Sequence, residues 1–181
     1  MGNLLFRRAR QYPLQRAKQL VEQIHQMKWD HLVISGDLTQ LSLEREFSLA
    51  RESLEPLLKY PERVTIIPGN HDRYIKESGA KDYYKQYFGE FFGDEEIHVR
   101  KLNVDWVIAG WDSAHPNDWL TASGTVRRST IQATENLLSS FSENTRFIIV
   151  NHYPLTFPED WKVDHFHELY NLVPVRKWIL R

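Results

Sequence analysis

The sequence predicts an α/β fold, in which short apolar strands alternate with amphipathic helices. Apolar runs occupy residues 31–35, 63–67, 104–110 and 146–150, and segments with helical periodicity lie between them. Each run ends in polar residues, and open α/β sheets place their ligands at the carboxyl ends of their strands. With 181 residues the chain has the length of one domain and can bury a sizeable core.

The first half of the chain has the pattern of a β-α-β unit. A helix is predicted from Pro13 to Lys28, because Pro suits a first helical turn and the apolar residues share one face. That face consists of Leu14, Ala17, Leu20, Val21, Ile24 and Met27. Strand 31–35, a helix over 42–59 and strand 63–67 follow, which implies parallel strands and a right-handed crossover. Residues 74–92 are expected to form helical turns that cover the site or pack beside it.

The second half is expected to contain two more strands and two helices. Strand 104–110 has a candidate hairpin partner at 97–102, and residues 117–128 are predicted to form a loop. Ser129, followed three residues later by Gln132, fits a capping box and predicts a helix that extends to Phe141. Strand 146–150, an aromatic loop and a last helix near residues 168–179 complete the predicted order.

Composition excludes several classes of function. A formal net charge of -1 gives no electrostatic reason to expect a nucleic-acid polymer as partner. The chain has no cysteine, so any metal must be held by Asp, Asn, Glu or His. No apolar run is long enough to span a membrane and no signal peptide is evident, so a cytoplasmic location is expected.

Three polar side chains stand within two residues of a strand end: Asp37, Asn70 and His152. Parallel strands would bring them to one edge of the sheet, and their oxygen and nitrogen atoms suit manganese, iron or zinc. Each also has a simpler explanation, because Gly-Asp is a common turn, Asn caps helices and a lone His is often a satisfied polar residue. The joint occurrence favours a metal site.

His71 and Asp72 follow the metal-ligand candidate Asn70 directly. The imidazole of His71 would lie beside a bound metal, within reach of the leaving group of a phosphate ester, where it can donate a proton. Asp72 is predicted to hold the tautomer and orientation of that imidazole. The alternative for Asp72 is the N-cap of the turns that follow.

Three sequence blocks resemble the calcineurin-like metallophosphoesterases, in particular their bacterial cyclic-nucleotide-phosphodiesterase-like branch. They are Gly-Asp-Leu-Thr at residues 36–39, Gly-Asn-His-Asp at 69–72 and Asn-His-Tyr-Pro at 151–154. The resemblance extends to Trp-Asp-Ser at 111–113 and covers most of the chain, so that residues 1–181 are expected to form a single, partial domain of this family. It implies a sandwich of β-sheets flanked by helices, in αββα order.

The resemblance also implies a mechanism and the role of each site residue. Asp37 would bridge two divalent metal ions, Asn70 and His152 would bind the second ion, and His71 with Asp72 would act on the leaving oxygen. A hydroxide bridging the metals would attack phosphorus in line. The expected partner is a small phosphate ester, most plausibly a phosphodiester.

Two further motifs of the family, Asp-x-His and Gly-His-x-His, do not occur in the sequence. His165-Phe166-His167 has the spacing of the latter without its Gly, and we interpret it as pocket lining or surface. We therefore expect a domain that is incomplete at both ends, with exposed sheet edges around 31–35 and 146–150 that favour self-association. The alternative function is a catalytically silent binding or structural module with the same fold.

Overall fold

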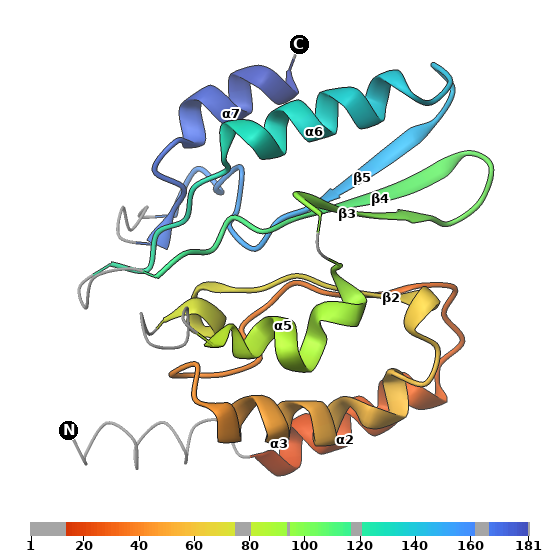
Figure 1. Ribbon diagram of the computed structural model, residues 1–181, viewed down its shortest axis with the longest axis vertical. Helices are drawn as coiled ribbons and strands as arrows, with labels where there is room; N and C mark the ends of the chain where they lie inside the picture. Colours follow the sequence, from red (N-terminus) through yellow and green to blue (C-terminus); the bar gives the residue numbers. More distant parts are fainter. Residues whose placement is uncertain (1–13, 75–80, 94, 117–120, 162–166, 181) are drawn as a thin grey trace.

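The structure, a computed structural model, describes residues 14–74, 81–93, 95–116, 121–161 and 167–180. These residues form a mixed α/β fold with two sheets, which confirms the predicted fold class. In Figure 1 the layers follow one another from bottom to top: α2 and α3, then the sheet that contains β2, then the sheet β3-β4-β5, then α6 and α7. Helices therefore flank a pair of sheets, as in the predicted sandwich.

The first half contains the predicted β-α-β unit. β1 (Leu32–Ile34) and β2 (Val64–Ile66) are parallel, and Val33 is in register with Thr65. Between them lie α3 (Glu44–Leu54), η1 (Glu55–Leu57) and η2 (Pro61–Arg63).

The first predicted helix is present as α2 (Leu14–Gln26), and its apolar face is largely exposed. Val21 is the buried residue of this helix, while Leu14, Leu20 and Met27 are about half exposed or more. Periodicity identified the helix correctly because it reports which side chains share a face. It does not report whether that face is covered.

The segment after β2 begins at the candidate site residues Asn70 to Asp72 and runs back to the core. It comprises η3 (Asn70–Arg73), α5 (Tyr83–Phe88) and η4 (Gly89–Phe91). The ring of Phe47 in α3 lies 6.2 to 6.5 Å from the rings of Tyr83, Tyr87 and Phe88. The prediction left open whether these helical turns cover the site or pack beside it. α5 packs on α3, beside the site.

The second sheet has the order β3-β4-β5. β3 (Ile97–Lys101) and β4 (Trp106–Trp111) form the predicted antiparallel hairpin, and β5 (Arg146–Val150) pairs with β4 in parallel. Within the loop predicted over 117–128, residues 117–120 lie outside the described residues, and Gly124 forms a bridge with Leu169.

Two helices cover the outer face of the second sheet. α6 (Arg128–Ser139) begins earlier than predicted, and its N-cap residue is Arg127. The prediction of Ser129 as N-cap is wrong because its hydroxyl instead donates to Glu96 Oε1 at 2.7 Å. The last helix, α7 (Leu172–Ile179), begins four residues later than predicted.

The core has two parts, one on each face of the second sheet. The first lies between the sheets and around α3 and α5, where Phe47, Ile66 and Ile67 meet Ile108 and Val150. The second lies between the second sheet and helices α6 and α7. Its buried members are Ile97, Trp111, Val126, Tyr153, Leu169 and Val175.

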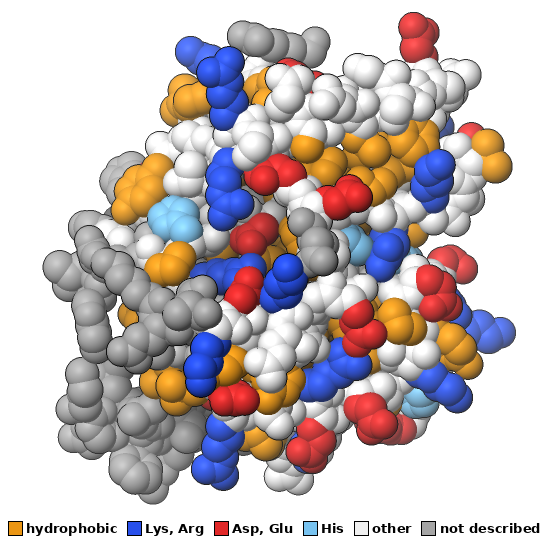
Figure 2. Space-filling model, in the orientation of Figure 1, with side chains coloured by type: hydrophobic (Ala, Val, Ile, Leu, Met, Phe, Trp, Pro, Cys, Tyr) orange, Lys and Arg blue, Asp and Glu red, His pale blue; other side chains and the backbone are white. Residues whose placement is uncertain are grey.

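β1 and β5 lie at the edges of their sheets, as predicted. Val33 and Ile148 on these strands are each 39% exposed, so some apolar surface accompanies the edges. Figure 2 shows Lys and Arg interspersed with Asp and Glu over the visible face of the molecule. In the parts of the chain described above, no helix has both the length and the apolar character needed to cross a bilayer.

Candidate metal centre

The turn after β1 aims Asp37 at the end of β2. Gly36 has a φ of 101° and Asp37 a φ of 60°, both in the left-handed region. Only glycine adopts such a backbone without cost, so Asp37 stores local strain of a kind that clusters at functional sites. A Cβ on Gly36 would lie 2.3 Å from the backbone nitrogen of Gly69. The two glycines therefore let the loops after β1 and β2 touch.

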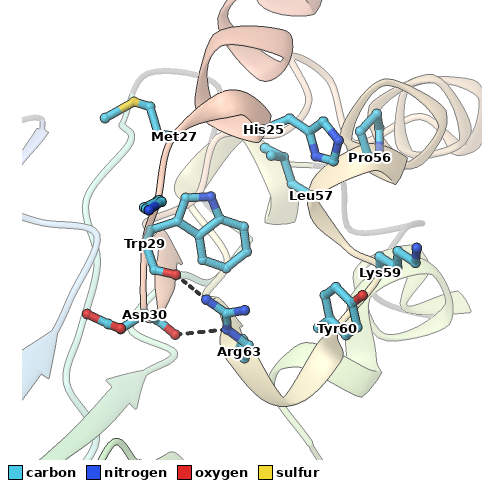
Figure 3. A pocket seen from close by; sticks show the side chains of 10 residues that line it. His25, Met27, Trp29, Asp30, Pro56, Leu57, Lys59, Tyr60 and Arg63 are labelled. Atoms are coloured by element: carbon cyan, nitrogen blue, oxygen red, sulfur yellow. Dashed lines mark hydrogen bonds between the residues drawn. The ribbon is translucent and has the colours of Figure 1, made fainter.

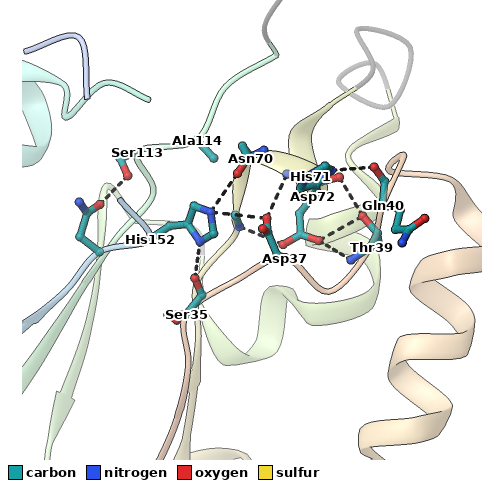
Figure 4. A network of polar contacts seen from close by, with 12 residues as sticks. Ser35, Asp37, Thr39, Gln40, Asn70, His71, Asp72, Ser113, Ala114 and His152 are labelled. Atoms are coloured by element: carbon teal, nitrogen blue, oxygen red, sulfur yellow. Dashed lines mark hydrogen bonds and ion pairs between the residues drawn. The ribbon is translucent and has the colours of Figure 1, made fainter. Parts of the chain in front are cut away.

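The three predicted metal ligands meet at this edge (Figure 4). His152 Nε2 lies 3.0 Å from Asn70 Oδ1 and 3.5 Å from Asp37 Oδ1. The other ring nitrogen of His152 lies 2.7 Å from the carbonyl oxygen of Ser35. Because a carbonyl oxygen only accepts, Nδ1 carries the hydrogen and Nε2 is the nitrogen directed at the two oxygens. The structure thus brings together Asp37, Asn70 and His152. The prediction that they share one sheet is wrong, because Asp37 and Asn70 follow β1 and β2 of the first sheet and His152 follows β5 of the second.

This arrangement fits a divalent cation. A neutral imidazole with its hydrogen on Nδ1 directs the lone pair of Nε2 at two oxygen atoms that also carry lone pairs. Three such hydrogen-bond acceptors that face one another need either a cation between them or a second proton on the ring. A Cβ on Gly69 would lie 2.2 Å from Asp37 Oδ1 and 2.8 Å from His152 Cε1. The absence of that atom leaves these two side chains room to converge.

The donor set is nevertheless small. Among the described residues, no group of three or more His, Asp or Glu side chains is arranged to hold a metal ion. With Asp37 and His152, the amide oxygen of Asn70 would complete a set of three donors for one ion, and Asp37 is the donor that a second ion would share. Of the His-x-His pair considered above, His165 lies outside the described residues.

His71 is oriented by a different group from the one predicted. Its Nδ1 lies 2.8 Å from the carbonyl oxygen of Gln40, so that Nδ1 donates and Nε2 is left for other partners. The ring stacks on Tyr74 at 5.5 Å between centroids. The backbone nitrogen of His71 donates to Asp37 Oδ1 at 3.1 Å. The prediction that Asp72 holds this imidazole is therefore wrong: Gln40 does so.

Asp72 instead joins the two loops of the site. Its carboxylate accepts from the backbone nitrogens of Thr39 and Gly69, each at 2.9 Å, and from the Thr39 hydroxyl at 3.1 Å. Asp72 therefore caps η3 from its third position, through the backbone nitrogen of the N-cap residue Gly69, whereas the alternative prediction places Asp72 itself at the N-cap of the turns that follow. Burial raises the pKa of the Asp72 carboxyl, and the hydrogen bond from Gly69 opposes this shift. Asp72 thus acts on the site through the loop that carries Asp37.

An ion-pair cluster that the sequence did not reveal holds η3 from its other end. Arg73 donates to Asp82 Oδ1 at 2.5 Å and to Asp112 Oδ2 at 2.9 Å, and its guanidinium lies 5.0 Å from the ring centre of Tyr84. Asp112 follows β4, so this cluster ties η3 to the second sheet. The sequence indicated Asp112 as a polar residue at the end of a strand. No sequence pattern indicated its partner Arg73.

The segment after β4 carries an aromatic pair near the surface. His115 lies 3.2 Å from the hydroxyl of Thr125 through Nε2, and its ring stacks on Tyr170 at 6.2 Å between centroids. Tyr170 is 64% exposed, which makes this aromatic pair accessible to solvent. Residues 117–120 of the predicted loop and residues 162–166 of the predicted aromatic loop lie outside the described residues.

Comparison with known proteins agrees with this geometry. A family model described as calcineurin-like phosphoesterase (Metallophos) matches residues 11–180. The match includes all three ligand candidates, the loop of residues 35–40 and helix η3. None of the curated proteins compared with the sequence matches it.

Proposed function

The chain belongs to the calcineurin-like phosphoesterase family, and from that premise we propose that it hydrolyses a phosphate ester, most plausibly a phosphodiester, in a metal-dependent reaction. Residues 1–181 would form one phosphoesterase domain. Asp37, Asn70 and His152 would hold the metal, and His71 would assist the leaving group.

One observation carries the proposal. The hydrogen bond from His152 Nδ1 to Ser35 fixes Nε2 as the nitrogen that faces Asn70 Oδ1 and Asp37 Oδ1. Divalent metals, when bound there, supply Lewis-acid polarisation of the phosphoryl group and activation of water. The family and the donor set support manganese, iron or zinc, and a pair of metals sharing Asp37 is the arrangement that the resemblance favours.

His71 is suited to move a proton at its Nε2 atom. Its Nδ1 hydrogen is engaged by the Gln40 carbonyl, which keeps the ring in one orientation. Nε2 is then the atom through which the ring would pass a proton to the leaving oxygen of an ester. Asp72 would act as a positioning residue, because its contacts fix the loop that contains both Asp37 and Gln40.

The substrate is proposed from the surroundings of the site. The stacked pair of His115 and Tyr170 offers an exposed aromatic surface that could stack on the base of a nucleotide ester such as a cyclic nucleotide, whose leaving oxygen belongs to the ribose. This is the substrate class of the branch that the sequence resembles. A cytoplasmic location is part of the same proposal, supported by composition alone.

The test measures hydrolysis of bis(p-nitrophenyl) phosphate in the presence of Mn²⁺. His152→Ala should lose bound metal and turnover together, because it removes the ligand atom. His71→Asn should keep bound metal and lose turnover by ~10² or more, with the largest loss for esters with poor leaving groups. His25→Asn, an exposed change on α2, should leave both unchanged. Unaltered turnover in His71→Asn would remove this residue from the mechanism.

The limited donor set supports a second candidate function. The described residues contain no group of three or more His, Asp or Glu side chains that could hold a metal ion, and one ion held by Asp37, Asn70 and His152 would bind a phosphate without activating water for attack. In that case the chain would be a metal-dependent binding module. It would bind Mn²⁺ and retain a phosphodiester such as a cyclic nucleotide, with no hydrolysis above background.

A further inference from the structure

A cavity of about 470 Å³ lies beside the starts of β1 and β2, outside the metal centre (Figure 3). Trp29 and Asp30 stand shortly before β1, and Arg63 is the residue before β2. The ligand candidates Asp37 and Asn70 follow the opposite ends of the same two strands. The cavity is therefore separate from the proposed phosphoesterase site, and its volume is typical of a pocket for a small molecule.

Aromatic and apolar side chains form the uncharged part of the cavity wall. They are Trp29, Pro56, Leu57 and Tyr60. The indole nitrogen of Trp29 donates to the carbonyl oxygen of Ile24 at 3.1 Å, which fixes this ring against the last turn of α2. Tyr60 is 48% exposed, so its ring has open surface. A flat ring can pack against this wall while the indole keeps its hydrogen bond.

Arg63 supplies a positive charge that is fixed in position. Its guanidinium lies 4.8 Å from the ring centre of Trp29 and donates to the carbonyl oxygens of Trp29 and Asp30 through Nη2 and Nε. The remaining terminal nitrogen, Nη1, makes no hydrogen bond with the described residues and is not enclosed by them, so it is open to a ligand. A planar guanidinium that is already held in place loses little freedom when it binds a phosphate or a carboxylate.

Lys28 and Lys59 add two exposed positive charges to the wall. Among the described residues, neither lysine nor Arg63 forms an ion pair with a carboxylate. Asp30 is the acidic member of the described wall, and Figure 3 shows its carboxylate directed away from the guanidinium, which meets the carbonyl oxygen instead. The cavity thus has a local excess of positive charge that favours an anionic ligand, although the formal net charge of the chain is -1.

A purely structural role explains part of this arrangement. The contacts of Arg63 join the segment before β1 to the start of β2, and Nε and Nη2 suffice for this purpose. The open Nη1 atom, the exposed ring of Tyr60 and the two lysines of the wall have no part in that role. Together they form a surface that is complementary to a ligand with an aromatic ring and a negative charge.

We propose that this cavity binds a small anion that carries an aromatic ring, the chemistry shared by phosphate monoesters with such a ring and by aromatic carboxylates. The anionic group accepts from Arg63 Nη1, with Lys28 and Lys59 as further positive charges, and the ring of the ligand packs on Tyr60. Lys59 Nζ lies 5.7 Å from the ring centre of Tyr60, so one side chain borders both parts of the ligand. The site does not depend on the proposed phosphoesterase activity, because it uses other residues at the other ends of the strands.

The test uses the His152→Ala protein prepared without metal, so that the metal centre does not contribute. The probes are phenyl phosphate, benzoate, inorganic phosphate and phenol. Binding is followed in NMR spectra by the indole Nε1–H signal of Trp29, which is assigned with Trp29→Phe. Phenyl phosphate or benzoate should shift this signal and bind about tenfold more tightly than inorganic phosphate and phenol, because each of the latter lacks one part of the ligand.

Substitutions in the wall separate the two parts of the site. Tyr60→Leu removes the ring and keeps an apolar side chain, so it should lower the affinity for the aromatic anion ~3- to 10-fold and leave that for inorganic phosphate unchanged. Arg63→Lys keeps the charge and loses the open terminal nitrogen, so it should lower both affinities about tenfold. Circular dichroism checks that each variant is folded, and the exposed position of Tyr60 keeps the test decisive if Arg63→Lys unfolds.

A matched pair of lysine variants tests the contribution of charge. Lys59→Gln should weaken binding of the aromatic anion, most at low salt. Lys177→Gln makes the same charge change on α7, at the other end of the molecule from α2 in Figure 1, and should bind like the starting protein. Tighter binding of phenyl phosphate than of benzoate identifies a phosphate ester as the ligand, and the reverse identifies a carboxylate. The proposal is overturned if neither anion moves the Trp29 signal at millimolar concentration, if neither binds more tightly than inorganic phosphate and phenol, or if the two lysine variants lose affinity equally.

Discussion

Gly69→Ala tests the metal centre without changing any proposed ligand. Gly69 has a φ of -97°, which alanine adopts readily, so the change adds one methyl group without backbone strain. That methyl carbon would lie 2.2 Å from Asp37 Oδ1, 2.4 Å from the backbone nitrogen of Asp37 and 2.8 Å from His152 Cε1. Every one of these neighbours belongs to a proposed ligand residue.

The size of the expected effect follows from these distances. Real Cβ atoms essentially never approach a neighbour within 3.0 Å, so Asp37 Oδ1 must retreat by about 0.8 Å. A metal site tolerates deviations of only about 0.2 Å in its ligand distances. We therefore expect the affinity for Mn²⁺ to fall by ~10- to 100-fold, the range seen when groups that support ligands are altered. Overpacking should also reduce the free energy of unfolding by ~1–3 kcal/mol.

Titration calorimetry with Mn²⁺ on the two proteins measures the first effect, and urea unfolding in the presence of a chelator measures the second. Gly89→Ala is the matched control, because a Cβ there lies 3.3 Å from the flexible side chain of Lys85 and far from any proposed ligand. It should bind Mn²⁺ like the parent protein. Unchanged affinity in Gly69→Ala, or an equal loss in both variants, would refute the assignment of Asp37 and His152 as ligands.

Three other outcomes are expected from the structure. His98 has a pKa of about 4 in the folded state and 6.5 in the unfolded state. The unfolded state therefore binds the extra proton, and about 2–3 kcal/mol of unfolding free energy should be lost as the pH falls from 6.5 to 4. Urea unfolding across that range should show a flatter pH dependence for His98→Gln than for the parent protein, and parallel curves would contradict this expectation. Arg73→Gln removes the cation that pairs with Asp112, whose side chain is only 14% exposed. This change should cost ~3 kcal/mol of unfolding free energy, whereas Lys18→Gln, at an exposed ion pair, should cost under ~1 kcal/mol. Ile148→Lys on edge strand β5 should weaken self-association in sedimentation experiments, and identical sedimentation of variant and parent would exclude this edge as the contact.

The order of elements and the three ligand candidates were predictable from sequence because the signals are local. An apolar run followed by Gly-Asp or Asn-His describes a strand and its end within seven residues. Parallel pairing brings together the ends of β1 and β2, whereas the approach of His152 depends on the packing of the second sheet against the first, which the sequence does not show. Asp37, Asn70 and His152 could be named from the local signal alone. The helix boundaries were less predictable: Ser129 fits a capping box, but Glu96 from a distant segment takes its hydroxyl hydrogen.

The parts that could not be predicted depend on backbone atoms or on long-range pairs. Every residue has a carbonyl oxygen, so the sequence contains no sign that Ser35 and Gln40 would hold the two imidazoles. The pairing of Arg73 with Asp112 joins two sheets across 39 residues. The exposure of the apolar face of α2 likewise depends on what packs against it, which periodicity does not report.

The loop of residues 35–40 orients both histidines of the candidate site. The carbonyl of Ser35 fixes His152, and the carbonyl of Gln40 fixes His71, so each ring has its hydrogen on Nδ1 and keeps Nε2 for other partners. Asp37 lies between these two carbonyls in sequence and accepts from the backbone nitrogen of His71. The loop is itself held by Asp72 through Thr39. The position of a proposed metal ligand, two ring orientations and the position of η3 therefore depend on six consecutive residues, and this loop should be the part of the candidate site least tolerant of insertion.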